Sequence, residues 1–391
     1  MNMLDSKAVR AFLDERHVDL AAKIADFVAR EIEPLPEPSD DDASREQARE
    51  IMADVGNAGW FDPIRDQDLR ACALIREALA HASPLADAVF ALQALGSTPI
   101  VLAGSEELRQ RWLTPAIKGE AMAAFAMTEP EAGSDVASMA TSARRDGESY
   151  VLNGQKTLIS NAGIADFYTV FASTDASKGS KGISCFVIAA DTPGLEFVRP
   201  LVMSAPHPLG DIAFVDCRVP RTAMLGAEGE GFKLGMATLD RLRSTVAAAA
   251  CGMAGRALQE ALDHATQRKQ FGTPIAEFQL IQEKLARMAT DLMAARLLVY
   301  RAVWEKDGGA ERVTMEAAMA KAFATEAAQR IVDDAVQILG GRGGLASSPV
   351  DRLYRSVRAL RIYEGTTEMQ HLIIAGQLIK EYRGQNRDSE I

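Results

Sequence analysis

Two long stretches of helical patterning, residues 232–268 and 275–305, contain no proline and dominate the C-terminal part of the chain. At 1.5 Å per residue, each helix would be on the order of 50 Å long, a length typical of helical bundles. Gly308-Gly309 separates the second stretch from a third, which ends at the glycine-rich segment 340–344. The sequence therefore predicts a C-terminal helical bundle.

The preceding chain changes its hydrophobic period near residue 121. Before it, helical patterns cover residues 20–32, 46–55, 68–81, 85–95 and 106–118, with Ser105 as the expected N-cap of the last. After it, Asn153-Gly154 predicts a type I′ hairpin turn, and short β-rich runs follow at 167–172, 183–188, 195–198 and 212–215. No helices separate these runs, which favours an antiparallel sheet or barrel over a βαβ fold.

The expected fold class is therefore α+β, in three domains. An N-terminal helical domain covers residues 1–120, a central antiparallel β-sheet or β-barrel domain covers residues 121–230, and a C-terminal four-helix-bundle domain covers residues 231–391. The length of 391 residues fits two or three domains of ordinary size.

Composition narrows the classes of function. The net charge of −11 argues against a nucleic-acid partner, because that affinity comes mainly from clustered Lys and Arg. We expect no metal site, since the four cysteines and five histidines lack metal-ligand spacing. No signal peptide and no run of about 18 uninterrupted apolar residues is found, so we expect a cytoplasmic protein without a membrane segment.

Four segments carry recognisable motifs: residues 126–135 (AMTEPEAGSD), 268–272 (RKQFG, followed by FQ at 278–279), 337–341 (QILGG) and 362–368 (IYEGTTE). Each resembles a signature of the acyl-CoA dehydrogenase family, and they stand in the family's order. A single short motif is weak evidence for a family, because such patterns also occur by chance, whereas four motifs in the right order are specific evidence. The resemblance covers essentially the whole chain and implies the helix–sheet–helix fold of that family.

The resemblance also implies FAD as the cofactor. The positions expected to bind it are Phe125, Met127, Thr128, Gly133, Ser134, Leu158, Ile159, Ser160, Arg268, Phe271, Phe278, Gln279, Gln337, Gly340, Gly341, Thr366 and Glu368. Hydroxyls of the 126–135 loop suit a flavin's polar edge, while an arginine and a glycine turn suit its pyrophosphate. In the family, Arg268 and Phe271 would serve the flavin of a neighbouring subunit. Ordinary turn bonds, a helix C-cap and a solvated cation are the alternative interpretations of these residues.

Two positions depart from the family's usual pattern. Many members have Trp where this chain has Leu158, and Thr where it has Ser160. The hydroxyl is retained, but the loss of Trp leaves the shielding of the flavin and its oxygen reactivity open; Leu158 could also be a core residue of a hairpin. His207, between two prolines, is expected to be a rigid, exposed loop residue.

The acyl substrate is expected at Ser134, Asp240, Arg243 and Gly365. The resemblance implies that Glu364 is the catalytic base, since a weakly acidic α-proton needs a carboxylate near Cα; without the motif, a lone Glu is most often a solvated surface residue. Related enzymes with their base on the long helix carry it at the position of Leu242, which cannot accept a proton. For Asp240 and Arg243 an ion pair within one helix is the default interpretation. Arg312 is a loose match to a residue that contacts a CoA phosphate.

The implied activity is FAD-dependent α,β-dehydrogenation of an acyl-CoA thioester to a trans-2-enoyl-CoA. Glu364 would take the α-proton, and hydride would pass from Cβ to flavin N5. The implied partners are an electron-transferring flavoprotein and further copies of the chain, as a homotetramer. An acyl-CoA oxidase, desulfinase or monooxygenase on the same fold, or a DNA-binding flavoprotein of the alkylation-response type, are the alternatives.

Overall fold

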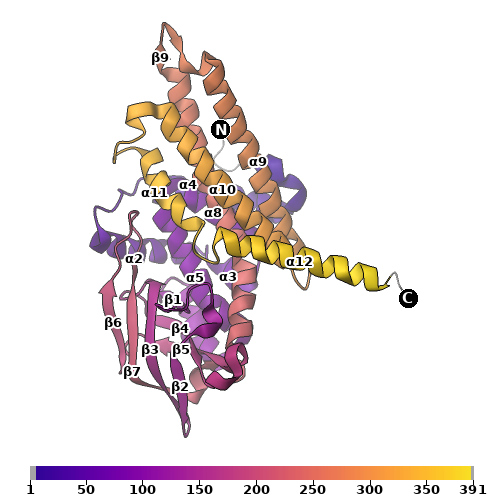
Figure 1. Cartoon of the computed structure of the whole chain (residues 1–391). Coiled ribbons are helices and arrows are strands. Elements are labelled where there is room, and N and C mark those ends of the chain that lie inside the picture. The colour runs from indigo at the N-terminus through magenta and orange to yellow at the C-terminus, as the bar shows by residue number, and fades with distance from the viewer. Residues whose placement is uncertain (1–5, 389–391) are drawn as a thin grey trace. The chain divides into compact units, whose positions relative to one another are not determined.

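The computed structural model describes residues 6–388 (Figure 1). The chain divides into two compact units. The first consists of the described chain up to Leu35, Asp68–Asp87 and the described chain from Asp240 onward, and the second consists of Pro36–Gln67 and Ala88–Leu239. The boundaries 1–120, 121–230 and 231–391 of three domains stay a prediction.

The first unit is helical. It contains α1 (Glu15–Phe27), α4 (Leu69–Ala82), most of α8 (Gly231–Gln267), α9 (Gln279–Asp307), α10 (Thr314–Leu339), α11 (Pro349–Leu360) and α12 (Thr367–Asp388). Helix α10 packs against α9, α11 and α12. Helices α8 and α4 approach closely at Gly252, where an added Cβ would lie 2.2 Å from the carbonyl oxygen of Glu77. The long helices predicted for 232–268 and 275–305 are confirmed to within a few residues.

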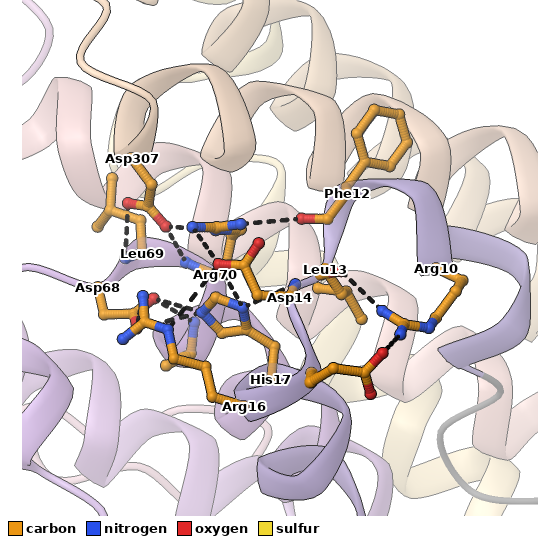
Figure 2. Close-up of polar contacts among 12 residues, drawn as sticks. Arg10, Phe12, Leu13, Asp14, Arg16, His17, Asp68, Leu69, Arg70 and Asp307 are labelled. Carbon is orange, nitrogen blue, oxygen red and sulfur yellow. Dashed lines mark hydrogen bonds and ion pairs between the residues drawn. The ribbon is translucent and has the colours of Figure 1, made fainter.

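A polar network joins α1, α4 and α9 inside this unit (Figure 2). Asp307, at the end of α9, accepts hydrogen bonds from the backbone N–H groups of Leu69 and Arg70, each at 3.0 Å. These are N–H groups that the first turn of α4 leaves without helical partners. Asp68 caps the same turn through Ala71 N and also contacts Nε2 of His17 at 3.1 Å. The helix therefore begins at a point fixed from two sides.

The second unit combines helices with a sheet. Its helices are α2 (Asp41–Asn57), α3 (Asp62–Asp66), most of α5 (Pro84–Ala103), α6 (Glu106–Leu108) and α7 (Thr114–Ile117). Its strands are β1 (Ala123–Ala126), β2 (Ser142–Asp146), β3 (Ser149–Ser160), β4 (Phe167–Ser173), β5 (Ile183–Ala189), β6 (Leu195–Pro200), β7 (Leu209–Pro220) and β8 (Met224–Leu225). The strand order is β6-β7-β3-β2-β4-β5-β8, with β1 beside β4. The sheet is mostly antiparallel, as predicted, but β4 pairs in parallel with β1 and β2.

The predicted hairpin turn at Asn153-Gly154 is wrong, because β3 continues through it. The turn lies earlier, between β2 and β3, where Gly147 has φ +62° after Asp146. Gly154 instead occupies a shift in the pairing of β3 with β7. An added Cβ there would lie 2.7 Å from Cα of Thr141, so its glycine permits a close backbone approach.

The N-terminal helices overlap the predicted ranges, but α1 and α2 each begin five residues earlier than predicted and α3 lies where no helix was predicted. Helix α5 is longer than predicted and passes through Pro99, and a wide turn at Arg109–Leu113 interrupts the predicted helix 106–118. Ser105 does cap α6, accepting from Leu108 N at 3.3 Å. Among the described helices, α5 alone is long and apolar enough to cross a membrane, and 72% of that window is buried inside the structure, as in a core helix.

Candidate active site

Glu364 lies in the short connection between α11 and α12, with a left-handed backbone. Its φ is +52° and that of Gly365 is +91°. Lys321 Nζ, on α10, donates to the carbonyl oxygen of Gly365 at 2.6 Å, and Gln370 Nε2, on α12, donates to the same oxygen at 2.9 Å. A left-handed residue other than glycine is strained and persists only where its surroundings hold it. Here the two side chains from α10 and α12 hold the connection through the carbonyl group of Gly365.

The carboxylate of Glu364 lies among buried charges of the first unit. Its Oε2 is buried and has no hydrogen-bond partner among the described residues. Burial raises the pKa of Glu364, against the opposing effect of the cations Arg76, Arg243 and Lys321. Burial likewise lowers the pKa of Lys321 to about 8. A carboxylate with an unused oxygen and a raised pKa is suited to accept a proton.

Arg76, the cation with the largest effect on the pKa of Glu364, already forms an ion pair with another carboxylate. Arg76 donates to both carboxylate oxygens of Asp87, at 2.7 and 3.0 Å, and to the hydroxyl of Thr245 at 2.9 Å. The predicted alternative base position, Leu242, is buried and apolar. Asp87 is therefore ion-paired, whereas Glu364 forms no direct ion pair with a described residue.

The backbone of Glu364 also has an unused group. Its N–H finds no acceptor among the described residues, whereas the neighbouring N–H groups of Tyr363 and Thr367 bond to the carbonyls of Ala359 and Arg361. An unpaired donor beside a carboxylate is the arrangement needed to stabilise a developing enolate oxygen.

The predicted ion pair of α8 is present. Arg243 Nη1 donates to Asp240 Oδ1 at 2.8 Å, and the Thr314 hydroxyl donates to Asp240 Oδ2 at 3.0 Å. Arg243 is buried, while Arg312 is exposed. Contact of these side chains with a CoA nucleotide stays a prediction.

The segment after α8 presents its predicted residues to solvent. Arg268, Phe271 and Gln279 are exposed, and the Phe271 ring, 97% exposed, lies 6.2 Å from the half-buried ring of Phe278. Phe271 has φ +51°, at the tip of the hairpin formed by β9 (Lys269–Gln270) and β10 (Thr273–Pro274). Such exposure is what a contact with a neighbouring subunit's cofactor requires.

The other two predicted groups of the first unit lie at helix ends. Helix α10 ends at Gly340, with φ +59°, and Gln337, Gly340 and Gly341 are exposed there. Thr366 caps α12, its hydroxyl accepting from Met369 N at 3.3 Å, with Glu368 exposed in the first turn. The alternative interpretations as helix caps thus hold structurally, and their FAD contacts stay predictions.

In the second unit, the 126–135 loop is held by a buried ion pair. Lys156 Nζ donates to Glu129 Oε1 at 2.8 Å and to the carbonyl oxygen of Met127 at 3.1 Å. The other contacts of Glu129 are the backbone N–H groups of Ala140, at 2.6 Å, and Thr141, at 3.0 Å. The loop is thereby fixed at its start and beyond its end.

The predicted hydroxyls of this loop are available to a ligand. Neither the half-buried Thr128 nor the exposed Ser134 has a side-chain partner among the described residues, so the alternative of local turn bonds is not what the structure has. Gly133 is exposed, with open space where a Cβ would stand. Phe125 is half-buried and Met127 is buried, so their apolar side chains can contribute packing contacts to a bound cofactor but no hydrogen bonds.

In the strand segment Leu158–Ile159–Ser160 and beside it, the structure excludes one alternative interpretation and corrects one expectation. Leu158 is not a core residue: it has φ +55° and is 57% exposed, at a shift in the pairing of β3 with β7. Ile159, in contrast, is buried. His207 is not a freely exposed loop residue, because it is half-buried and its Nε2 lies 2.7 Å from the Ser160 hydroxyl.

Sequence reasoning missed the residues that hold the site, namely Lys321, Gln370, Lys156 and Glu129. Lys321 offered one signal, since it lies on the same helical face as the buried Ala317, Ala324 and Ala328. A lysine in the middle of an apolar face is rarely left buried without a partner. The other three have no such signal.

These residues fit a flavin. The second unit offers hydroxyls at Thr128 and Ser134 without a side-chain partner among the described residues, and an exposed apolar side chain at Leu158, while the first unit offers exposed Arg268 and Phe271. No group of three or more described His, Cys, Asp or Glu side chains could hold a metal ion, and all four cysteines are buried thiols.

Comparison with known proteins gives the same assignment along the whole chain. Residues 14–120, 124–217 and 229–379 match the family models "Acyl-CoA dehydrogenase, N-terminal domain", "middle domain" and "C-terminal domain". The 3-(aryl)acrylate reductase of Clostridium sporogenes (strain ATCC 15579) is 43% identical over 380 residues, covering 94% of this chain and all of the relative.

Solved structures agree. Butyryl-CoA dehydrogenase from Megasphaera elsdenii superposes with a TM-score of 0.88 at 35% identity, over 94% of this chain and 99% of that one. A chain from a structure described as the electron transferring flavoprotein of Acidaminococcus fermentans superposes with a TM-score of 0.88 at 35% identity, over 94% of this chain and 98% of that one. The chain belongs to the acyl-CoA dehydrogenase family of FAD-dependent oxidoreductases.

Proposed function

We propose that this protein removes hydrogen from the α and β carbons of an acyl-CoA thioester, giving a trans-2-enoyl-CoA. The observation that carries the proposal is the Glu364 carboxylate, whose buried Oε2 has no partner and whose pKa is raised by burial. Glu364 takes the α-proton, and its own backbone N–H donates to the thioester oxygen as negative charge develops there. Bound FAD supplies the hydride acceptor for Cβ.

Thr128, Ser134 and Ser160 of the second unit hold the flavin edge in this proposal, with Phe125, Met127, Gly133, Leu158 and Ile159 as its neighbours. Arg268, Phe271, Phe278, Gln279, Gln337, Gly340, Gly341, Thr366 and Glu368 of the first unit complete the set. Gly365 leaves room for the acyl group beside Glu364, and Ser134, Asp240 and Arg243 contact the rest of the substrate.

The substrate and acceptor classes follow from the relatives. Similarity to a butyryl-CoA dehydrogenase and to a chain from a structure described as an electron transferring flavoprotein favours a short acyl chain and a flavoprotein as electron acceptor. A cytoplasmic location is proposed with them.

A second candidate is the reverse reaction, saturation of the double bond of a 3-arylacrylate group. The 43% identity to a 3-(aryl)acrylate reductase, across that protein's full length, favours it. The two directions share Glu364, which would then return a proton to Cα. The two candidates differ in the rates they predict. A reductase should be oxidised by cinnamoyl-CoA faster than the oxidised enzyme is reduced by butyryl-CoA, and a dehydrogenase should show the opposite order.

The test is Glu364→Gln, which keeps size and polarity but cannot accept the proton. Anaerobic stopped-flow bleaching of the bound flavin by butyryl-CoA and 3-phenylpropionyl-CoA should slow by about 10²–10⁴-fold, the usual contribution of a positioned base. Substrate binding should persist. Glu381→Gln, at an exposed carboxylate of α12, is the matched control. Bleaching of the Glu364→Gln protein within a fewfold of the parent rate would remove Glu364 from the reaction.

A further inference from the structure

The proposed function gives Ser160 a contact with the flavin but gives no role to its partner His207. The Ser160 hydroxyl lies 2.7 Å from Nε2 of His207, a hydrogen-bond distance. Ser160 is the last residue of β3, and His207 stands between Pro206 and Pro208 in the loop that leads into β7. The two residues are distant in sequence, so the fold brings them together.

The backbone holds both partners in place. Asn161 N donates to the carbonyl oxygen of Pro208 at 2.9 Å, and Ser160 pairs with Leu209 in the sheet. Arg45 of α2 donates to the carbonyl oxygens of Ala162 and Leu209, each at 2.7 Å. The two segments are thus clamped on both sides of the pair.

The imidazole is neutral at physiological pH. Burial lowers the pKa of His207 to about 4. Two smaller effects act on this pKa in opposite directions, since Asp41 raises it and Arg45 lowers it. A neutral imidazole has one donor and one acceptor nitrogen, and a serine hydroxyl has one proton and two lone pairs. A bond to His207 therefore fixes where the remaining hydrogen-bonding group of Ser160 points.

We propose that His207 is a positioning residue, which holds the Ser160 hydroxyl in one orientation toward the flavin edge and thereby sets the reduction potential of bound FAD. This rests on the proposed function, in which Ser160 contacts the flavin. Reduction changes flavin N5 from a hydrogen-bond acceptor into a donor. A hydroxyl with a fixed proton consequently bonds the oxidised and reduced cofactor unequally.

A double-mutant cycle on the holoenzyme tests the pair. Midpoint potentials of bound FAD are measured for the parent, Ser160→Ala, His207→Ala and the double variant. Each single change should alter the equilibrium constant of flavin reduction in the same direction, by about threefold to tenfold, the range of one hydrogen bond. The double variant should match Ser160→Ala, because His207 acts only through Ser160.

Two further variants separate positioning from structural damage. His207→Gln places an amide nitrogen near the position of Nε2 and should restore much of the parent potential, and it serves in place of His207→Ala if that protein does not fold. Val202→Ala, at a 74% exposed position of the same loop, should leave the potential unchanged.

The outcomes distinguish this inference from the proposed function. A parent protein that binds FAD and oxidises acyl-CoA, but whose cycle is additive or whose His207 variants keep the parent potential, overturns the role of His207 alone. A parent protein that never retains FAD overturns both. Non-additive shifts with rescue by Gln support the pair.

Discussion

At the scale of the residue, Glu364 combines a left-handed backbone with a buried carboxylate oxygen that has no hydrogen-bond partner among the described residues. Both features cost stability, and the unpartnered oxygen leaves an acceptor for a proton. The backbone strain is the same for any side chain other than glycine, so the buried carboxylate alone predicts that the parent protein is less stable than a variant with a neutral side chain of the same size at this position.

That difference should depend on pH. The pKa of Glu364 is raised in the folded protein, so its contribution to stability is present at low pH and is lost as pH rises above the ordinary value of about 4.3. Glu364→Gln does not titrate. Its advantage over the parent in free energy of unfolding should therefore grow as pH rises above about 4.3 and level off above the raised pKa of Glu364, by at most about 1.4 kcal/mol per pH unit between the two pKa values.

Thermal denaturation of the FAD-loaded proteins across that range is the measurement, with Glu381→Gln run in parallel. A constant difference between parent and Glu364→Gln at all pH values would show that the carboxylate titrates normally.

At this scale the sequence motifs name candidate residues, whose roles stay predictions, but they carry little information on the surroundings of those residues. Glu364 was identified through its motif, and the orphan Oε2 is compatible with that role. The exposure predicted for His207 was wrong, and the alternative of a core position for Leu158 is excluded, because burial here depends on a shift in the pairing of β3 with β7 and on the contact of His207 with Ser160, 47 residues earlier in the chain. Neither feature leaves a local pattern.

At the scale of the element, the connection between α11 and α12 depends on Lys321. Lys321→Met removes the bond to the Gly365 carbonyl while keeping a long apolar side chain in the alanine-rich face of α10. The Glu364 backbone should then relax away from its strained conformation. A displacement of about 1 Å can cost on the order of 100-fold in rate, so the rate of flavin bleaching should fall by tenfold or more.

The readout is the bleaching rate at saturating acyl-CoA, together with FAD content and melting temperature. Gln370→Leu, which removes the second bond to the same carbonyl, is the companion variant and should act in the same direction. An unchanged rate in both proteins would mean that the connection needs neither helix.

Strands were harder to predict than helices at this scale. The long helices follow from proline-free runs and a 3.6-residue period, which are local. The hairpin was misplaced because Asp146-Gly147 and Asn153-Gly154 carry the same turn signal, and only the close approach of Thr141 to Gly154 decides between them. The strands β1 and β2 were not predicted, because their sequences AAFA and SARRD contain no β-branched residue.

At the scale of the whole molecule, we expect a homotetramer. Large apolar side chains of α12, Leu372, Leu378, Ile379 and Tyr382, are 50–66% exposed, and Phe271 is 97% exposed. Clustered exposed apolar side chains on a helix typically mark an interface. The order of helices, sheet and helices was predicted from the sequence, whereas the number of copies depends on surfaces that one chain leaves uncovered.

Arg268→Ala should lower both FAD retention and the fraction of tetramer, because in the proposed site this residue serves a neighbour's flavin. Light scattering and flavin absorbance on the same gel-filtration run measure the two together. Lys269→Ala, at the adjacent exposed position, is the control. A stable monomer that retains one FAD per chain would contradict the shared site.

Four of the six described non-glycine residues with positive φ, Leu158, Asn161, Phe271 and Glu364, lie in or beside the proposed flavin and substrate segments. β-Branched side chains are the least compatible with that backbone. In a library of random variants selected only for folded protein, Val, Ile and Thr should accordingly be depleted at these four positions, even where activity is never assayed. The shape of the chain would then restrict the evolutionary paths open to the site before its chemistry does.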